Sequence, residues 1–339
     1  MTNEQVNRAN EASTKADPRN PDKQLVAMID SVPPGGTLDG AFFDIDVQNV
    51  VDAFARAAQR GVKVRLATET DYYFQPSSKT ELRPAIQQLL AAGVEIKHDA
   101  RDGGLMHDKF LIANGQSVWT GSYNITDGGS YRENNNALKL DSKELAAEFQ
   151  HEFDKMFVHN NFGTNTNNGI SADDHPAPKT INVGGAEVTT YFSPSKAAEG
   201  GAKAAILAEL AKAQTSIQFL AFSYTDDEIG QAMLQKAQSG VKVEGVFEKS
   251  QAASRYSEYQ VLNGAEATNA NIDVRIDSNP ALMHHKVIIV DDSTLIMGSF
   301  NFSASAQSDN NENMLVIKNA PELVAKYKAE FGRVQAQAA

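Results

Sequence analysis

The sequence predicts an α/β protein built from two tandem units, each an α/β/α sandwich in which helices cover a mixed sheet. Two observations carry this prediction. Short motifs of the first half return in the same order in the second half, and in each half strand-like apolar runs alternate with helical patterns before a run of strands. The length of 339 residues agrees with two domains.

Four pairs of short segments define the repeat. The first pair is RGVKVRLATE from Arg60 with SGVKVEGVFE from Ser239, and the second is MHDK from Met106 with MHHK from Met283. The third pair is TGSYNIT from Thr120 with MGSFNFS from Met297, and the fourth is NNNALKL from Asn134 with NENMLVI from Asn311. Because the order and the spacing are nearly constant, we interpret the chain as a tandem duplication of a unit of roughly 150 residues.

The elements of the first unit follow from its apolar patterns. We expect strands and helices in this order: strand 37–43, helix 47–59, strand 63–67, helix 82–91, strand 94–98, strands 106–113, 117–120 and 137–140, and helix 143–157. Gly61 and Gly93 come directly after two of these helices, where a left-handed cap residue belongs.

The second unit repeats this order from residue 187 and ends in a helix over 321–337. The stretch between the units is rich in Asn, Gly and Pro and therefore reads as a loop. The sequence thus predicts four regions, which are a polar tail over 1–23, a first unit over 24–160, a linker over 161–184 and a second unit over 185–339.

Composition excludes several classes of protein. The chain has no cysteine, which rules out disulfides, thiolate nucleophiles and zinc–thiolate sites, and which is typical of exported bacterial proteins. No apolar run approaches the roughly 18 residues of a membrane span, and no signal peptide is recognisable in the polar first residues. The net charge of −12 argues against broad binding of nucleic acid or anionic membrane.

The repeated motif places a histidine and a lysine on the same face of a strand. Residues i and i+2 of a strand point to one side, so His107 lies beside Lys109, and His284 beside Lys286. The residue between them changes from Asp in the first copy to His in the second. The face that carries the imidazole and the ammonium is therefore the one that the repeat preserves.

This pair of side chains suits an anion rather than a metal ion. An ammonium group repels a cation, whereas it can hold a phosphoryl oxygen while a neutral imidazole attacks phosphorus. The Gly-Ser-x-Asn that follows each pair adds a hydroxyl and an amide at a tight turn. A single histidine or a single turn of this kind is more often structural, but both features recur together in both halves.

The stretches HDKFLIAN and HHKVIIVD, each followed by GSxN, resemble the HxKxxxxD signature of the phospholipase D superfamily, and the resemblance extends from about residue 24 to 335. It implies two units packed face to face, with pseudo-two-fold symmetry, around one active site where the two histidines meet. One histidine would form a phosphohistidine intermediate and the other would protonate the leaving group and then activate water. No metal or organic cofactor is implied.

The resemblance assigns roles residue by residue. The catalytic residues are His107, Lys109, His284 and Lys286, with His107 as nucleophile, and the phosphate-binding residues are Ser122, Asn124, Ser299 and Asn301. The supporting residues are Asn114, Asp291, Asn135 and Glu312. Asn114 departs from the acidic position that Asp291 fills, which concerns local stability rather than chemistry. Glu312 is expected to orient a histidine.

The expected substrate is a phosphodiester. The leading hypothesis is hydrolysis of phospholipid head groups, or their transfer to an alcohol, and the alternative is a nuclease acting by the same mechanism. A non-catalytic binding protein is disfavoured because both motifs retain every reacting residue. Since one chain carries both motifs, a monomer would suffice. Lys79, Arg83, Arg101 and Arg132 are the basic residues near the motifs that a polyanion would need.

Weaker candidates are given no catalytic role. His285 faces the opposite side of its strand, and FFDID over 42–46 is explained equally well by a strand end and a helix cap. DYYFQP over 71–76 follows a strand end, where its aromatic residues either contact substrate or pack internally. DDHP over 173–176 is expected to be solvated loop. Three histidines without a repeat partner are set aside as well, namely His98, His151 and His159.

Overall fold

The computed structural model describes residue 11 and residues 13–166, 170–195 and 200–339. These residues form two compact units. Unit 1 contains the described residues up to Ala177 together with Asp309–Glu312, and unit 2 contains Pro178–Ser308 and Asn313–Ala339. Each unit has its own mixed sheet, so the predicted α/β class with one sheet per repeat is confirmed.

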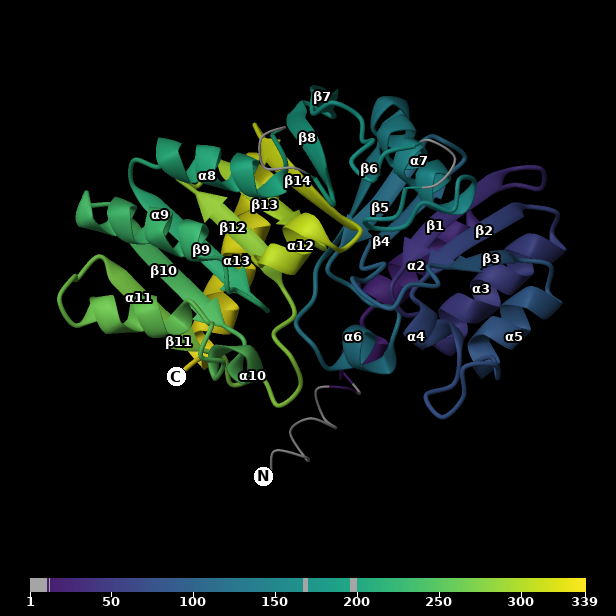
Figure 1. The fold of residues 1–339 in the computed structure, drawn as a ribbon, viewed down its shortest axis with the longest axis horizontal. Coiled ribbons are helices and arrows are strands. Elements are labelled where there is room, and N and C mark those ends of the chain that lie inside the picture. The colour runs from purple at the N-terminus through teal and green to yellow at the C-terminus, as the bar shows by residue number, and fades with distance from the viewer. Residues whose placement is uncertain (1–10, 12, 167–169, 196–199) are drawn as a thin grey trace. The chain divides into compact units, whose positions relative to one another are not determined.

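The sheet of unit 1 has six strands in the order β3-β2-β1-β4-β5-β6 (Figure 1). The first three are parallel, and β4, β5 and β6 continue the sheet in antiparallel pairs. The strands are β1 (Thr37–Phe42), β2 (Lys63–Thr68), β3 (Glu95–His98), β4 (Lys109–Ala113), β5 (Ser117–Gly121) and β6 (Ala137–Asp141).

Helices cover both faces of this sheet. On one face α2 (Pro21–Asp30), α3 (Gln48–Gln59) and α5 (Pro84–Ala91) bury their apolar sides in a core shared with β1, β2 and β4. On the other face lies α7 (Lys143–Phe157), whose Phe149 packs edge-on against Phe110 of β4. The short helices α4 (Thr70–Tyr73) and α6 (Asp127–Tyr131) lie in the connections.

The sheet of unit 2 has eight strands in the order β11-β10-β9-β12-β13-β14-β8-β7, and its first six reproduce the order found in unit 1. The strands are β7 (Thr180–Val183), β8 (Ala186–Ser193), β9 (Ser216–Ala221), β10 (Lys242–Phe247), β11 (Ile272–Ile276), β12 (Lys286–Val290), β13 (Thr294–Gly298) and β14 (Glu312–Lys318). The same sequence pattern has therefore given the same topology twice.

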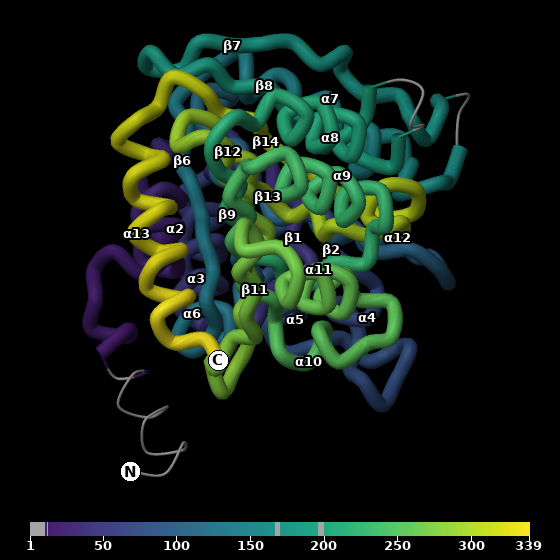
Figure 2. Tube along the Cα trace, turned by 90° about the vertical axis from the view of Figure 1, so that its left-hand side faces the viewer, coloured from purple at the N-terminus to yellow at the C-terminus, as the bar shows by residue number. Residues whose placement is uncertain are grey.

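The helices of unit 2 are also divided between two faces. Figure 2 shows α13 (Pro321–Gln337) on one side of the strands and α8 (Ala202–Lys212), α9 (Asp227–Gln238) and α11 (Tyr259–Glu266) on the other. The second group shares a core with the sheet. The short helices α10 (Lys249–Ala252) and α12 (Ala304–Ser308) complete the unit. Within the described residues, none of the helices has the length and hydrophobicity needed to cross a bilayer.

Three local differences from the predicted elements matter. The strand predicted from 106 begins at Lys109 in the structure, so His107 lies in the approach to β4 rather than inside it. β7 is a short strand paired with β8 in the stretch predicted as linker loop, because Thr180–Val183 has an apolar residue to bury beside Val188. Helix α2 begins at Pro21, inside the predicted tail, with Asn20 as its N-cap.

Residues 309–312 form a segment, here called the strap, that packs in unit 1 although it lies far along the chain. Its Asn311 pairs with Met106 as an isolated parallel bridge, and the N–H of Asn311 donates to the carbonyl of Leu105 at 2.8 Å. The strap thus runs along the residues that lead into β4, which are the residues that carry His107.

Candidate active site

His107 is fixed by the strap through both its backbone and its side chain. The backbone N–H of His107 donates to the carbonyl of Asn311 at 3.0 Å, and its Nδ1 lies 2.8 Å from Oε2 of Glu312. His107 is 5% exposed and Glu312 is fully buried. A carboxylate against Nδ1 selects the tautomer that carries its proton there, which leaves Nε2 with its lone pair.

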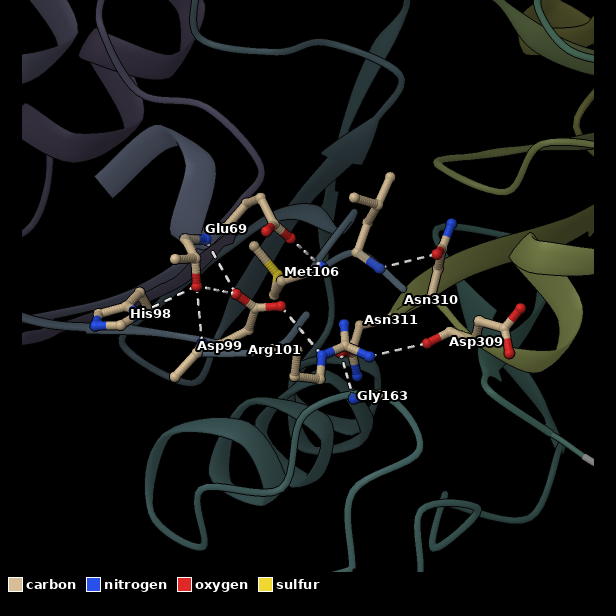
Figure 3. Close-up of polar contacts among 12 residues, drawn as sticks. Glu69, His98, Asp99, Arg101, Met106, Gly163, Asp309, Asn310 and Asn311 are labelled. Carbon is tan, nitrogen blue, oxygen red and sulfur yellow. Dashed lines mark hydrogen bonds and ion pairs between the residues drawn. The ribbon is translucent and has the colours of Figure 1, made fainter. Parts of the chain in front are cut away.

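The residues before His107 are held at both edges, as Figure 3 shows. The N–H of Met106 donates to Oε2 of Glu69 at 2.7 Å, and the N–H of Leu105 donates to Oδ1 of Asn310 at 2.9 Å. Burial raises the pKa of Glu69 to about 7, with a further contribution from the nearby Asp99. The approach to β4 is therefore fixed by Glu69, the residue that follows β2, and by side chains of the strap.

Arg101 joins the strap to the rest of unit 1 (Figure 3). Its Nε lies 3.1 Å from Oδ2 of Asp99 and its Nη1 donates to the carbonyl of Asp309 at 3.0 Å. A Cβ atom at Gly163 would lie 1.6 Å from Nη1 of Arg101, and the N–H of Gly163 donates to Oδ1 of Asn311 at 2.7 Å. Glycine is needed there because the guanidinium fills the space of a side chain.

Lys109 is the most deeply placed cation of the first motif. It is 1% exposed, its Nζ donates to the carbonyl of His107, and the same atom lies 4.9 Å from the ring centre of Phe43. Burial lowers the pKa of Lys109 to about 7, while the carboxylates of Glu312, Asp108, Asp44 and Glu69 oppose that fall. The ammonium is thus held beside the imidazole with little water around it.

The second motif repeats these contacts in unit 2. His284 is 4% exposed, and Nζ of Lys286 donates to its carbonyl at 2.8 Å. Both side chains contact the ring of Phe222. His285, between them, lies with its Nε2 3.1 Å from Oε1 of Glu330 in α13. His285 is thus on the face opposite to the motif, as expected, where its partner is a carboxylate of α13.

The serines of the Gly-Ser-x-Asn motifs bind backbone of the neighbouring strand. Oγ of Ser122 accepts the N–H of Asn136 at 3.1 Å, and Oγ of Ser299 accepts the N–H of Asn313 at 3.0 Å. Both serines are fully buried. Their predicted role as phosphate donors stays a prediction, and the structure adds a second role, which is to close the turn against the next strand.

The motif asparagines differ from the serines in their surroundings. Asn124 and Asn301 are partly exposed residues, yet each has a buried Oδ1 without a hydrogen-bond partner in the described structure. Buried polar atoms of folded proteins nearly always have a partner. The same exception occurs at the same position of the two units. A carboxamide Oδ1 only accepts hydrogen bonds, so it suits a donor such as a hydroxyl group and not a phosphoryl oxygen. The predicted phosphate-binding role of the two asparagines therefore stays a prediction.

The predicted supporting residues hold backbone close to the motifs. Oδ1 of Asn114 accepts the N–H of Thr37 at 2.9 Å, and Asp291 accepts the N–H groups of three successive residues, Gln214, Thr215 and Ser216. Both adopt the left-handed conformation, which asparagine and aspartate tolerate. Asn135 accepts the hydroxyl of Ser122 at 2.9 Å. The carboxamide of Asn114 therefore accepts fewer backbone hydrogen bonds than the carboxylate of Asp291 at the equivalent position.

The stretch over 42–46 does not cap a helix, since the N-cap of α3 is Val47 without a side-chain bond. Asp44 is instead buried, with Oδ1 3.3 Å from Nη1 of Arg83. Burial raises the pKa of Asp44 to about 7, against the opposing charge of Arg83. The carboxyl group lies near enough to Lys109 to affect its pKa.

The aromatic residues over 71–76 pack within unit 1. Tyr72 lies edge-on to Phe43 with ring centres 4.7 Å apart, and Tyr73 and Phe74 both contact the ring of His98. His98 also lies 3.1 Å from Oγ1 of Thr70, which explains this histidine as a structural one. Of the two readings left open, internal packing is the one that the structure shows.

His175 corrects the expectation of a solvated loop over 173–176. Its Nδ1 lies 2.8 Å from Oε2 of Glu152, which is fully buried and is also paired with Lys155 at 3.0 Å. Burial alone would raise the pKa of Glu152, but its interactions with Lys155 and His175 outweigh burial and lower that pKa to about 2. His151 is half-exposed, 3.6 Å from Asp174, and carries no sign of a catalytic role.

The four basic residues near the motifs differ in their exposure to solvent and in their carboxylate partners. Arg83 and Arg101 have internal carboxylate partners and small exposed fractions, whereas Lys79 and Arg132 are exposed. In the described part of the chain, no group of three or more His, Asp or Glu side chains is arranged to hold a metal ion.

Comparisons with known proteins now place the chain in a family. Residues 35–157 and 206–335 match the model of the cardiolipin synthase PLD-like domain, which covers most of both repeats. The chain belongs to the phospholipase D superfamily. The match occurs once in each half, in agreement with the tandem duplication.

The chain is similar to individual proteins over part or most of its length. A phospholipase D of Rickettsia typhi is 35% identical over 132 residues, which are 39% of this chain and 60% of that protein's length. The phospholipase D family member Nuc from Salmonella typhimurium is 33% identical, with a TM-score of 0.41, over 45% of this chain and 97% of that one. Phosphatidylserine synthase of Haemophilus influenzae shares the fold at 12% identity, with a TM-score of 0.72, over 94% of this chain and 84% of that one.

Sequence reasoning missed the residues that surround the motif. Phe43 and Phe222 occupy equivalent positions just after β1 and β9, and Glu69 lies at the end of the first repeated segment. An alignment of the two halves would have singled out the two phenylalanines. The contacts of Arg101 with the strap have no counterpart in the sequence pattern, because they join residues that are distant along the chain.

Proposed function

We propose that the chain is a metal-independent phosphodiesterase of the phospholipase D type that acts through a phosphohistidine intermediate. The observation that carries the proposal is the contact of Glu312 with Nδ1 of His107 at 2.8 Å. It supports His107 as the nucleophile, because a histidine whose Nδ1 donates to a carboxylate presents Nε2 for attack. Family membership supports the reaction class.

In the first step, Nε2 of His107 attacks phosphorus and the bond from phosphorus to the leaving oxygen breaks. The proposed acid is His284 in its protonated form, which transfers its proton to that oxygen. In the second step, the neutral His284 takes a proton from water or from an acceptor alcohol, whose oxygen attacks phosphorus while the phosphorus–nitrogen bond breaks. Each step returns the proton that the other used.

The lysines and asparagines would bind the phosphoryl oxygens. Lys109 and Lys286 are buried ammonium groups beside the two histidines, so they stabilise negative charge in a site of low dielectric. Asn124 and Asn301 would contribute through the N–H groups of their carboxamides, which can donate to a phosphoryl oxygen. A lysine next to each histidine also supports chemistry without a metal, because the ammonium repels a second cation.

We propose a phospholipid as the substrate. The net charge of −12 and the internal pairing of Arg83 and Arg101 leave few basic side chains for a long polyanion. The similarity to a protein named phospholipase D supports the same direction. Trp119 is buried, so it is not available to anchor the protein at a lipid surface, and this observation keeps a nuclease as the alternative.

The test offers both substrates to one preparation. Labelled phosphatidylcholine in mixed micelles with ethanol, and labelled DNA, are each incubated with the full chain in excess EDTA, with His107→Asn as the control. We expect release of choline and formation of phosphatidylethanol, both absent in the variant. Rapid cutting of DNA without phosphatidylethanol would establish the alternative, and activity restored only by a divalent ion would contradict the mechanism.

A further inference from the structure

An aromatic residue stands at the same place beside the motif in each unit. Phe43 directly follows β1 and Phe222 directly follows β9. The N–H of Phe43 donates to the carbonyl of Asp108 at 3.1 Å, and the N–H of Phe222 donates to the carbonyl of His285 at 2.9 Å. The acceptor is in both cases the residue between the motif histidine and lysine, so backbone pairing fixes each ring against the motif.

Each ring contacts both reacting side chains of its unit. The ring centres of Phe43 and His107 are 5.0 Å apart at 69°, and those of Phe222 and His284 are 4.6 Å apart at 65°. The Nζ of each motif lysine lies over the same ring, at 4.9 Å in unit 1 and 4.6 Å in unit 2. The edge-to-face arrangement and the ammonium over the ring are favourable geometries for an aromatic quadrupole.

The neighbours of the two rings differ, although the contacts are the same. In unit 1 the next residue is the buried Asp44 and Tyr72 packs on the ring, whereas in unit 2 the next residue is Ser223. The arrangement of ring, imidazole and ammonium has thus been kept while its surroundings have changed. This is the pattern of a functional requirement rather than of ordinary packing.

A ring has one chemical advantage over a carboxylate at this position. A carboxylate would neutralise the ammonium by accepting its hydrogens and would then compete with a phosphate for them. The face of a ring stabilises the positive charge without a lone pair in that direction, so hydrogens stay available to an incoming anion.

We propose that Phe43 and Phe222 are positioning residues, whose ring faces hold the ammonium groups of Lys109 and Lys286 charged and aimed at the phosphoryl oxygens of the substrate. The inference rests on the proposed function, because it names how that site binds its phosphate. It applies to any phosphodiester substrate, since the phosphate group alone is recognised.

The decisive experiment weakens the negative electrostatic potential on the ring face and nearly preserves the shape of the side chain. Phenylalanine carrying one, two and three fluorine atoms is introduced at position 43, and separately at position 222, and kcat/KM is measured for hydrolysis of the preferred substrate. Fluorine weakens the negative face of the ring stepwise. We expect kcat/KM to fall in the same order, by roughly 3- to 30-fold over the series.

The matched control is Phe110, which adjoins Lys109 in the chain but packs against Phe149 on the opposite face. The same fluorinated series at position 110 should leave kcat/KM unchanged. A flat series at both 43 and 222 in an active enzyme would overturn the inference. An inactive wild-type chain would instead contradict the proposed function.

A second readout does not depend on activity. The pKa of Lys109 is measured by carbon NMR of its Cε, with Lys109→Arg identifying the signal. Burial lowers this pKa, and the carboxylates that face the ammonium are Glu312, Asp108, Asp44 and Glu69. We expect Phe43→Leu to lower the pKa of Lys109 further and Phe43→Tyr, which keeps an aromatic ring, to leave this pKa at its wild-type value. Equal values in the two variants would show that the ring only fills space.

Discussion

Glu312 and its counterpart in the repeat differ in the groups that they contact. Glu312 lies against Nδ1 of His107, while the aligned residue of the first half is Asn135, an amide that accepts the hydroxyl of Ser122. A carboxylate strengthens the basicity of the ring nitrogen opposite to it, and an amide does so far less. We therefore expect the difference between Glu312 and Asn135 to favour His107 as the nucleophile.

Glu312→Gln tests the orientation of His107. We expect kcat/KM to fall by roughly 10²- to 10⁴-fold, because the amide no longer selects the tautomer with a free Nε2. Glu330→Gln is the control, since Glu330 also contacts a histidine, with its Oε1 3.1 Å from Nε2 of His285, and should leave kcat/KM within a few-fold. Equal losses in the two variants, measured at equal folded fraction, would remove the assignment of the nucleophile.

Asp44 should make the stability of the protein fall with rising pH. Its pKa is raised from 3.8 to about 7 by burial, so the native state binds a proton that the unfolded state has released between these values. The stabilisation is complete below about pH 4 and is lost as pH rises through 7. Asp44→Asn has no carboxyl group to titrate. The free energy of unfolding of this variant, relative to wild type, should therefore increase between about pH 4 and pH 7, by up to about 4 kcal/mol.

The comparison is made by urea unfolding of both proteins at pH 5 and pH 8. A constant difference between the two would show that Asp44 is ionised throughout. Because Asn also removes the charge opposite Arg83, the change with pH carries the test and the absolute difference at one pH does not.

At the scale of elements, β5 and β13 end in glycines that let the next strand approach. A Cβ at Gly121 would lie 2.2 Å from the carbonyl oxygen of Asn136, and one at Gly298 would lie 2.3 Å from that of Asn313. The serine that follows each glycine is thereby brought to hydrogen-bond distance of the neighbouring strand. Packing against the next strand therefore requires the glycine of each motif.

Gly121→Ala is therefore expected to destabilise the protein by about 1–3 kcal/mol, because a methyl group cannot share space with a strand backbone. Gly264→Ala, in α11 where a Cβ meets open space, should be neutral or slightly stabilising. Midpoints of urea unfolding give both values. A neutral Gly121→Ala would mean that β6 can move away without cost.

Elements that depend on local pattern could be predicted from the sequence. Gly61 and Gly93, both with positive φ, end α3 and α5 as expected, and α7 and α13 have the predicted bounds. The missed features depend on distant contacts. The strap at 309–312 has no periodicity of its own, and His175 reaches Glu152 through a loop whose polar letters resemble solvated sequence. Among the site residues, the motif predicted the histidines and lysines but not the rings beneath them.

At the scale of the whole molecule, one chain carries two copies of the motif that differ in their partners. If both histidines serve one site within a chain, neither unit can act alone. We expect His107→Asn and His284→Asn to be inactive separately, with losses of several orders of magnitude.

An equimolar mixture of the two inactive variants should stay inactive, because every chain lacks one of its histidines. His285→Asn serves as the control that retains activity. Recovery of a measurable fraction of wild-type rate in the mixture would show that the site is assembled from units of different chains.

The position of the strap has a consequence for biosynthesis. Unit 1 needs residues 309–312, which leave the ribosome only after nearly all of unit 2. At ordinary elongation rates that delay is on the order of ten seconds. During it the nascent first half has the residues of its six strands but lacks Glu312, so His107 has no carboxylate against its Nδ1. In the proposed mechanism, the growing chain would therefore acquire an oriented nucleophile only when its synthesis is almost finished.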